Sequence, residues 1–242
     1  MLFRSTDKTV TWKSSSTAVA TVSNGTVKGV KAGTVKITVT TPGKNYVKNT
    51  KTVTIKVVPA STTSLTAANQ ATGVKLTWKK ITGVTGYKVY KGSTLLKKIT
   101  SASTVTYTDT KVNTNGTKYT FKVVPYITSA DKSTVSGTSK SVTTYRVSRP
   151  AISSLKNSAT KKMTVKWGKN TKATGYEIWY STSKSFSTKK TATVTKNTTV
   201  SKTITSLTKG KTYYVKVRSY KTVSGKKYYS AWSVVKTVKI TK

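Results

Sequence analysis

The sequence predicts an all-β chain built as a series of antiparallel β-sandwiches. Segments that alternate apolar and polar residues recur about every eight to twelve residues, with Gly, Asn, Ser and Thr between them, which is typical of antiparallel sandwiches. Helical periodicity is absent. Val and Thr, whose β-branched side chains suit a pleated surface, dominate the composition.

The strands follow from these alternating segments in chain order. We expect them at residues 18–23, 34–40, 50–58, 74–78, 86–90, 118–124, 163–167, 175–180, 212–220 and 234–240. Two stretches, 57–64 and 145–154, combine Pro with small polar residues and predict domain boundaries, since Pro cannot donate to a sheet. The predicted domains are therefore 1–58, 59–148 and 149–242.

An internal repeat links the second and third domains. Trp78 is followed by Gly86-Tyr87 and Trp167 by Gly175-Tyr176, at the same offset. Downstream, "GTKYTFKV" at 116–123 matches "GKTYYVKV" at 210–217. Residues 61–145 and 151–242 are thus two copies of one unit.

Each copy resembles a fibronectin type III domain. The resemblance rests on an inner Trp, then "GY-x-[VI]", then "G-x-x-Y-x-x-K-V". It implies tandem immunoglobulin-like sandwiches arranged as beads on a string, and it places two tyrosines at the tyrosine corner, whose hydroxyl bonds to the upstream backbone. The landmark residues are Trp78, Tyr87 and Tyr119 in the first copy and Trp167, Tyr176 and Tyr213 in the second.

The opening stretch resembles the bacterial group 2 immunoglobulin-like family. The match runs from Thr11-Trp12 through "VATV" at 19–22 and Asn24-Gly25 to "KAGT" at 31–34. In that family one or two strands precede the Trp. We therefore expect residues 1–58 to lack their first strands, and either to pair with another chain or to be the least ordered part. Further domains upstream in the parent protein are expected as well.

The charge is the strongest compositional signal. Lys+Arg 45 against Asp+Glu 4 gives 45 − 4 = +41. A field of one sign favours polyanionic partners such as teichoic acid, acidic glycans or nucleic acid. A solvated sheet surface accounts for each Lys singly, but ordinary soluble surfaces mix both signs. Nucleic acid has no recognised motif here.

Enzymatic chemistry lacks its usual residues. The chain has no His and no Cys, which removes the commonest general base and the thiolate metal ligands. The four acids, Asp7, Asp109, Asp131 and Glu177, fall in three different units and are not expected to meet as a catalytic pair. We expect no enzymatic activity, no metal and no cofactor. No apolar run reaches the roughly 18 residues of a membrane span.

The third domain carries a candidate binding face. Strand parity places Tyr176, Ile178, Tyr213, Val215 and Val217 inward. The opposite face, bordered by "KKYYSAW" at 226–232, holds the candidate residues Trp179, Tyr214, Lys216, Arg218, Tyr228 and Trp232. Exposed rings with interleaved cations can stack on sugars or bases. Alternatively, they are cross-strand pairs that cover a sheet.

Two further features complete the expected sites. The equivalent face of the second domain, with Lys88, Tyr90, Thr120 and Lys122, has fewer aromatic residues. Glu177 is expected to pair with a neighbouring cation. The long connections 126–137 and 220–230 are a second candidate for recognition, because many fibronectin type III domains use this turn.

These observations favour a non-catalytic C-terminal module array from a secreted or cell-surface bacterial protein. It would act as a stalk or adhesion module held electrostatically against anionic wall polymers or glycans. The alternative is a structural or decoration protein on the surface of a phage virion, and a nonspecific nucleic-acid binder is the third interpretation.

Overall fold

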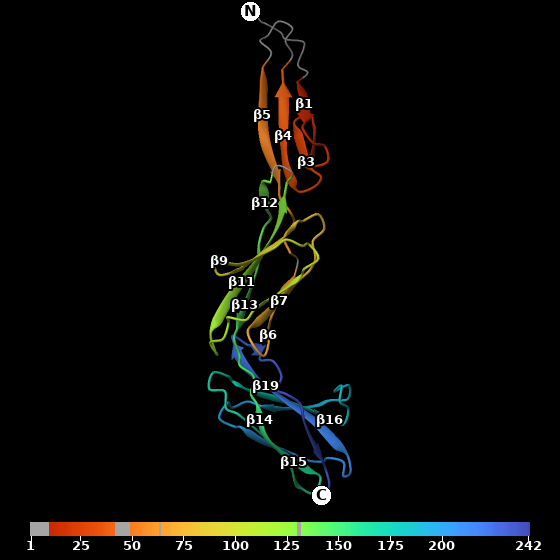
Figure 1. Ribbon diagram of the computed structural model, residues 1–242, viewed down its shortest axis with the longest axis vertical. Coiled ribbons are helices and arrows are strands. Elements are labelled where there is room, and N and C mark those ends of the chain that lie inside the picture. Colours follow the sequence, from red (N-terminus) through yellow and green to blue (C-terminus); the bar gives the residue numbers. More distant parts are fainter. Residues whose placement is uncertain (1–9, 42–48, 63, 130–131) are drawn as a thin grey trace, which may run out of the picture. The chain divides into compact units, whose positions relative to one another are not determined.

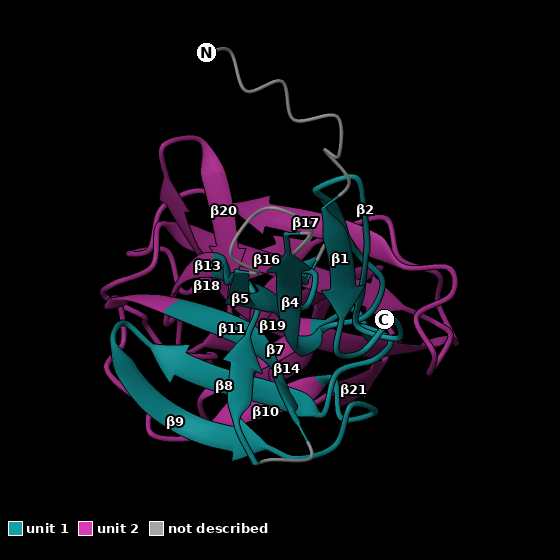
Figure 2. Ribbon diagram, turned by 90° about the horizontal axis from the view of Figure 1, so that it is seen from above, with its two compact units in different colours: residues 1–65, 78–105, 121–141 teal, residues 66–77, 106–120, 142–242 magenta. Residues whose placement is uncertain are grey.

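The computed structural model describes residues 10–41, 49–62, 64–129 and 132–242. Within these ranges every regular element is a β-strand, so the chain is all-β. None of the described segments forms a helix that would span a membrane. The contacts divide the chain into two compact units, residues 1–65, 78–105 and 121–141, and residues 66–77, 106–120 and 142–242 (Figure 2).

The first domain contains a three-stranded sheet and a hairpin. The sheet has the order β1 (Thr11–Ser14), β4 (Gly33–Thr40), β5 (Thr50–Val57), and these strands run side by side in Figure 1. The hairpin joins β2 (Ala20–Ser23) to β3 (Thr26–Gly29).

The hairpin turn and the core of this domain both follow from the sequence. Asn24 and Gly25 have φ angles of 47° and 78°, the left-handed backbone that a two-residue turn between antiparallel strands requires. Ala20, Val35 and Ile37 form a small buried cluster, with four partly buried residues packed against it. Trp12 is 36% exposed, and its ring lies against the Gly25 turn.

The two repeats have the same strand order. In the second domain, one sheet is β10 (Thr106–Asp109), β7 (Val74–Trp78), β6 (Leu65–Asn69). The other is β12 (Thr134–Ser136), β11 (Lys118–Thr128), β8 (Gly86–Lys91), β9 (Thr94–Ile99), with β13 (Lys140–Tyr145) also paired to β11.

The third domain reproduces this layout. One sheet is β14 (Ile152–Ala159), β15 (Lys162–Trp167), β18 (Ser201–Ile204). The other is β17 (Lys190–Val194), β16 (Gly175–Ser181), β19 (Thr212–Val223), β20 (Lys226–Tyr229), with β21 (Lys236–Lys239) also paired to β19. Its core cluster includes Met163, Trp167, Tyr176, Ile178, Val215, Val217 and Ile240.

The landmark residues make equivalent contacts in both repeats. The ring centroids of Trp78 and Tyr87 lie 5.3 Å apart, and those of Trp167 and Tyr176 lie 5.2 Å apart. Each tyrosine hydroxyl ties two loops together. Tyr87 accepts a hydrogen bond from Ile81 N and donates to Ala102 O, and Tyr176 does the same with Asn170 N and Asn197 O.

The glycine before each of these tyrosines is required by a close approach of backbone. A Cβ on Gly86 would collide with the carbonyl oxygen of Ile99, and a Cβ on Gly175 with that of Val194. Both residues of the repeated "GY" are therefore needed: the glycine because a Cβ would not fit there, and the tyrosine because its hydroxyl joins two loops. Further along, Tyr213 Oη accepts a hydrogen bond of 3.1 Å from Thr208 N, five residues upstream, while Tyr119 in β11 is half-buried.

Arg146, in the stretch between the two repeats, is buried and hydrogen-bonded. Arg146 is 4% exposed, and its guanidinium donates to Asn69 Oδ1 and to the carbonyl oxygens of Gln70 and Ala71. Asn69 Nδ2 donates in turn to Tyr145 O and Tyr229 O, at 2.9 Å each. Burial lowers the pKa of Arg146 from its usual value, but an arginine still stays protonated at neutral pH.

A second set of hydrogen bonds holds Ser148, which belongs to the same stretch. Asn115 Nδ2 donates to Asn170 Oδ1 at 2.7 Å, Asn170 Nδ2 to Ser148 O at 2.8 Å, and Ser148 N to Asn115 Oδ1 at 3.0 Å. The three residues close a ring of bonds. The segment that the sequence predicts as a linker is therefore held by hydrogen bonds to residues of both repeats.

Several strand boundaries differ from the expected ones. The first predicted strand, 18–23, begins only at Ala20, because Val19 N and Ala20 N both donate to Ser16 O in a turn. The last, 234–240, is shortened to 236–239. Asp7 and Asp131, the segment before residue 10 and part of the connection 126–137 lie outside the described residues.

Candidate binding face

Two neighbouring strands of the third domain present the candidate face. In β16 and β19, Glu177 lies opposite Arg218, Trp179 opposite Lys216 and Ser181 opposite Tyr214. The intervening residues Tyr176, Ile178, Tyr213, Val215 and Val217 are all buried. Because side chains alternate along a strand, the polar and aromatic set shares the outer face.

Aromatic rings and cations alternate across this face. Trp179 and Trp232 have ring centroids 4.5 Å apart. Arg218 Cζ lies 4.4 Å from the ring centroid of Trp232 and 3.7 Å from that of Tyr229. We call this set the cation–aromatic strip; it consists of Trp179, Phe186, Lys189, Lys216, Arg218, Tyr229 and Trp232.

Two lysines also lie over the rings of the strip. Lys216 Nζ lies 4.0 Å from the ring centroid of Phe186, 4.8 Å from Trp179 and 4.9 Å from Trp232, and Lys189 Nζ is 4.4 Å from Trp179. The quadrupole of an aromatic face attracts cations at these distances. The π-faces of Trp179 and Trp232 are therefore already engaged by cations of the chain itself.

Lys216 is a partly buried cation of the strip. Burial lowers its pKa below the usual lysine value, and the positive charges of Arg218 and Lys189 lower it further. Crowding of three cations keeps the local field strongly positive, because Glu177 supplies one compensating charge. Glu177 Oε1 accepts hydrogen bonds from Arg218 Nη2 at 2.7 Å and from Arg218 Nε at 3.2 Å, which is the cross-strand pair that the sequence predicts.

Two serines hold Trp232 in the strip. Ser230 Oγ accepts from Ser219 N at 2.9 Å, and Ser233 Oγ accepts from Val217 N at 3.0 Å. The backbone N–H groups of both serines donate back to β19, to Ser219 O and Val217 O. Side-chain oxygens thus replace part of the β-ladder beside Trp232, which explains why the last strand starts later than expected.

The structure brings four of the six candidate residues into the strip: Trp179, Lys216, Arg218 and Trp232. Tyr214 lies on the same face of β19, opposite Ser181 and Thr237. Tyr228 lies elsewhere, since it pairs with Lys221 and its ring meets that of Tyr145 at 5.0 Å.

Three members of the strip were not among the residues singled out from the sequence: Phe186, Lys189 and Tyr229. Tyr229 pairs with Tyr220, which lies two positions from Arg218 in β19, so Tyr229 shares the face of Arg218. Phe186 sits in a turn with φ 59°, a left-handed conformation that is unusual for an aromatic residue. No alternation pattern marks such a position.

The equivalent face of the second domain is simpler. Lys122 lies opposite Tyr90 in β11 and β8, with its Nζ 4.7 Å from the ring centroid. Thr120 Oγ1 is hydrogen-bonded to Thr143 Oγ1 at 3.1 Å. Lys88 Nζ lies 5.6 Å from the ring of Tyr126, and Lys98 Nζ 5.2 Å from the same ring.

The two acidic residues that the structure describes, Asp109 and Glu177, both have hydrogen-bond partners. No group of three or more potential metal ligands occurs among the described residues. Asp109 is buried, and its Oδ1 accepts from Lys111 N at 3.0 Å, which is a role in a turn. Glu177 is paired with Arg218.

The strand order and the landmark contacts give the second and third domains the same layout of two antiparallel sheets. Residues 2–55 match the family model described as bacterial Ig-like domain (group 2). No curated protein sequence matches the chain.

Two of the solved structures to which the chain is similar come from chicken proteins. The FN1–FN3 domains of chicken CNTN1 are 15% identical, with a TM-score of 0.40, over 86% of this chain and 78% of that one. A two-domain fibronectin type III segment of chicken tenascin is 14% identical, with a TM-score of 0.35, over 75% of this chain and 98% of that one.

Proposed function

We propose that the chain is a non-catalytic stalk and adhesion module of a bacterial cell surface or secreted protein, held electrostatically against anionic wall polymers. The observation that carries the proposal is the strip, where the rings are engaged by the chain's own cations. What the face offers to a ligand is therefore a row of ammonium and guanidinium donors. A polyanion fits such a row better than a neutral sugar, which would need a free aromatic face.

The composition supports the same proposal. A net charge of +41 extends over all three domains, so attachment would draw on many weak contacts. Each contact at an exposed position is screened by salt over a Debye length of about 8–10 Å. Group 2 immunoglobulin-like domains are typical of bacterial surfaces, where teichoic acids and acidic glycans provide such polymers.

Sedimentation with Gram-positive cell walls tests this proposal. The purified chain would be spun with intact walls and with walls stripped of teichoic acid, across a salt series. We expect binding that falls steeply with salt and is lost on stripping, while Trp179→Ala/Tyr214→Ala binds almost as wild type. Binding that resists salt and stripping but fails in the double variant would replace the electrostatic proposal with a specific sugar site on the aromatic residues.

A further inference from the structure

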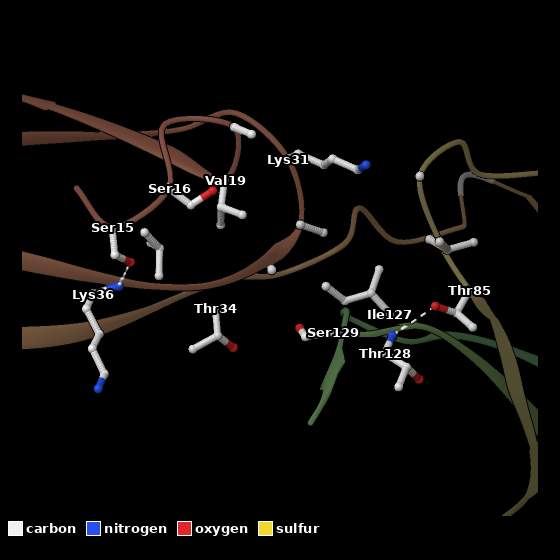
Figure 3. A pocket seen from close by; sticks show the side chains of 16 residues that line it. Ser15, Ser16, Val19, Lys31, Thr34, Lys36, Thr85, Ile127, Thr128 and Ser129 are labelled. Atoms are coloured by element: carbon white, nitrogen blue, oxygen red, sulfur yellow. Dashed lines mark hydrogen bonds between the residues drawn. The ribbon is translucent and has the colours of Figure 1, made fainter. Parts of the chain in front are cut away.

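A pocket of about 780 Å³ lies within the first compact unit, apart from the strip (Figure 3). It is lined by the turns 15–19 and 31–33, the following residues of β4, the connection 83–85 and residues 127–129. Residues 127 and 128 end β11 and Ser129 follows it, and all three lie in 126–137, one of the two long connections that the sequence predicts as candidates for recognition.

Hydroxyl groups of the lining are left as donors. Ser15 Oγ accepts a hydrogen bond from Lys36 N at 3.0 Å, and Thr85 Oγ1 accepts from Thr128 N at 2.8 Å. A hydroxyl that accepts from the backbone keeps its own hydrogen for another acceptor. Both side chains therefore offer an O–H to whatever occupies the pocket.

Thr34 adds a buried hydroxyl. Its Oγ1 is inaccessible to solvent and has no hydrogen-bond partner among the described residues, and Thr34 lines the pocket. Buried polar atoms in native proteins are nearly always satisfied by protein, water or ligand. Because the oxygen is closed to solvent as it stands, the Thr34 side chain would have to turn about χ1 to bring it to an acceptor in the pocket.

The charged lining residues are both cations. Lys31 and Lys36 line the pocket and are exposed, and no carboxylate occurs among the lining residues. With the three hydroxyls they form a set of donors. Such a set calls for a ligand that is rich in acceptor oxygens and negatively charged.

Apolar side chains complete the lining. Val35 and Ile127 are 2% and 6% exposed, and Val19 and Val84 are half-buried. Small-molecule sites combine such surfaces with a few converging polar groups, in volumes of roughly 300–1,000 Å³. The C–H faces of a sugar or polyol would lie on the apolar part and its oxygens on the donors.

We propose that this pocket binds one or two units of an anionic polyol chain, a sugar or polyol that carries phosphate or carboxylate. The anionic groups of two successive units would meet Lys31 and Lys36, whose ammonium groups lie at opposite sides of Figure 3, and the polyol oxygens would accept from Ser15, Thr34 and Thr85. This inference rests on the proposed attachment to anionic polymers and names the repeat unit that is recognised.

Titration of the full chain with short oligomers tests the site. The probes are a glycerol phosphate oligomer, a uronic acid oligomer of similar length and a neutral oligosaccharide, followed by calorimetry and by amide shifts of residues 15, 34 and 85. We expect saturable binding of at least one anionic probe and none of the neutral one. The comparison of phosphate with carboxylate identifies the source of the anion.

Two variants separate a site from general charge. Thr34→Val removes a hydroxyl without a partner, so the variant should fold normally. It should bind the oligomer about fivefold to tenfold more weakly, which corresponds to the loss of one hydrogen bond of roughly 1 kcal/mol. Lys31→Gln should weaken it more than Lys28→Gln, a change of equal charge at an exposed position of β3 outside the pocket.

If Lys31→Gln and Lys28→Gln weakened oligomer binding equally, and Thr34→Val bound as wild type, the proposed binding site would be wrong. The wall experiment separates the two proposals. Loss of oligomer binding with intact wall sedimentation would defeat the pocket alone, whereas saturable oligomer binding without wall sedimentation would defeat the stalk attachment and leave the pocket standing.

Discussion

The two repeats share their internal contacts and differ on their outer faces. Trp78–Tyr87 and Trp167–Tyr176 have the same geometry, and both tyrosine hydroxyls join the same kind of loops. On the outer face of the second domain, Lys122 lies over the ring of Tyr90. In the third domain, three cations lie over the one ring of Trp179. The fold explains the inner set. The strip is not required by the fold, which is why we assign a function to it.

The largest expected effect tests the shared interior. Trp78→Ala and Trp167→Ala each remove a ring that is 3% and 2% exposed, respectively. Each should lower the free energy of unfolding of its own repeat by about 3–5 kcal/mol, measured by urea unfolding. A loss under about 1 kcal/mol in one repeat would break the equivalence.

The next effect tests the difference between the faces. Lys189→Gln/Lys216→Gln/Arg218→Gln removes three charges from the strip, and Lys88→Gln/Lys98→Gln/Lys122→Gln removes three from the second domain. At about 1 kcal/mol for each cation at an anionic surface, the strip variant should bind walls up to about a hundredfold more weakly. The control should lose less than about tenfold, and equal losses would mean that the strip has no special role.

The tyrosine hydroxyls are expected to matter less than the rings. Tyr87→Phe and Tyr176→Phe leave Ile81 N and Asn170 N without their acceptor. Each should cost about 1–3 kcal/mol in the free energy of unfolding, again by urea unfolding. Wall sedimentation should be unchanged in both, and a change in binding would show that the loops take part in it.

The smallest effect concerns the ion pair of the strip. Glu177→Gln removes the partner of Arg218 and should change the free energy of unfolding by less than about 1 kcal/mol, since partly exposed pairs contribute little. Wall binding should rise slightly, because one negative charge is lost. Weaker binding of this variant would indicate that Glu177 holds Arg218 in the geometry that the polymer needs.

Alternation and spacing predicted the all-β fold, the repeat and the outward row Trp179, Lys216 and Arg218, because strand parity is a local property of the sequence. They missed Phe186, which reaches the strip through a left-handed turn, and Lys189, which lies outside any strand, just before β17. They also placed Tyr228 beside the strip, although its neighbour Tyr229 faces it. The pocket was beyond such reasoning, since residues 15–36, 83–85 and 127–129 meet only in the folded unit.

The bonds around Arg146 bear on how such chains can be shortened or recombined. A cut after residue 148 would remove Tyr229 O from Asn69 and Asn170 from Asn115, and would leave the amide groups of Asn69 and Asn115 to be solvated anew. The two repeats are therefore not freely exchangeable parts, although their sequences read as copies. Duplication of such a unit must be followed by co-adaptation of its ends, and a recombinant fragment is better taken across this boundary than ended at it.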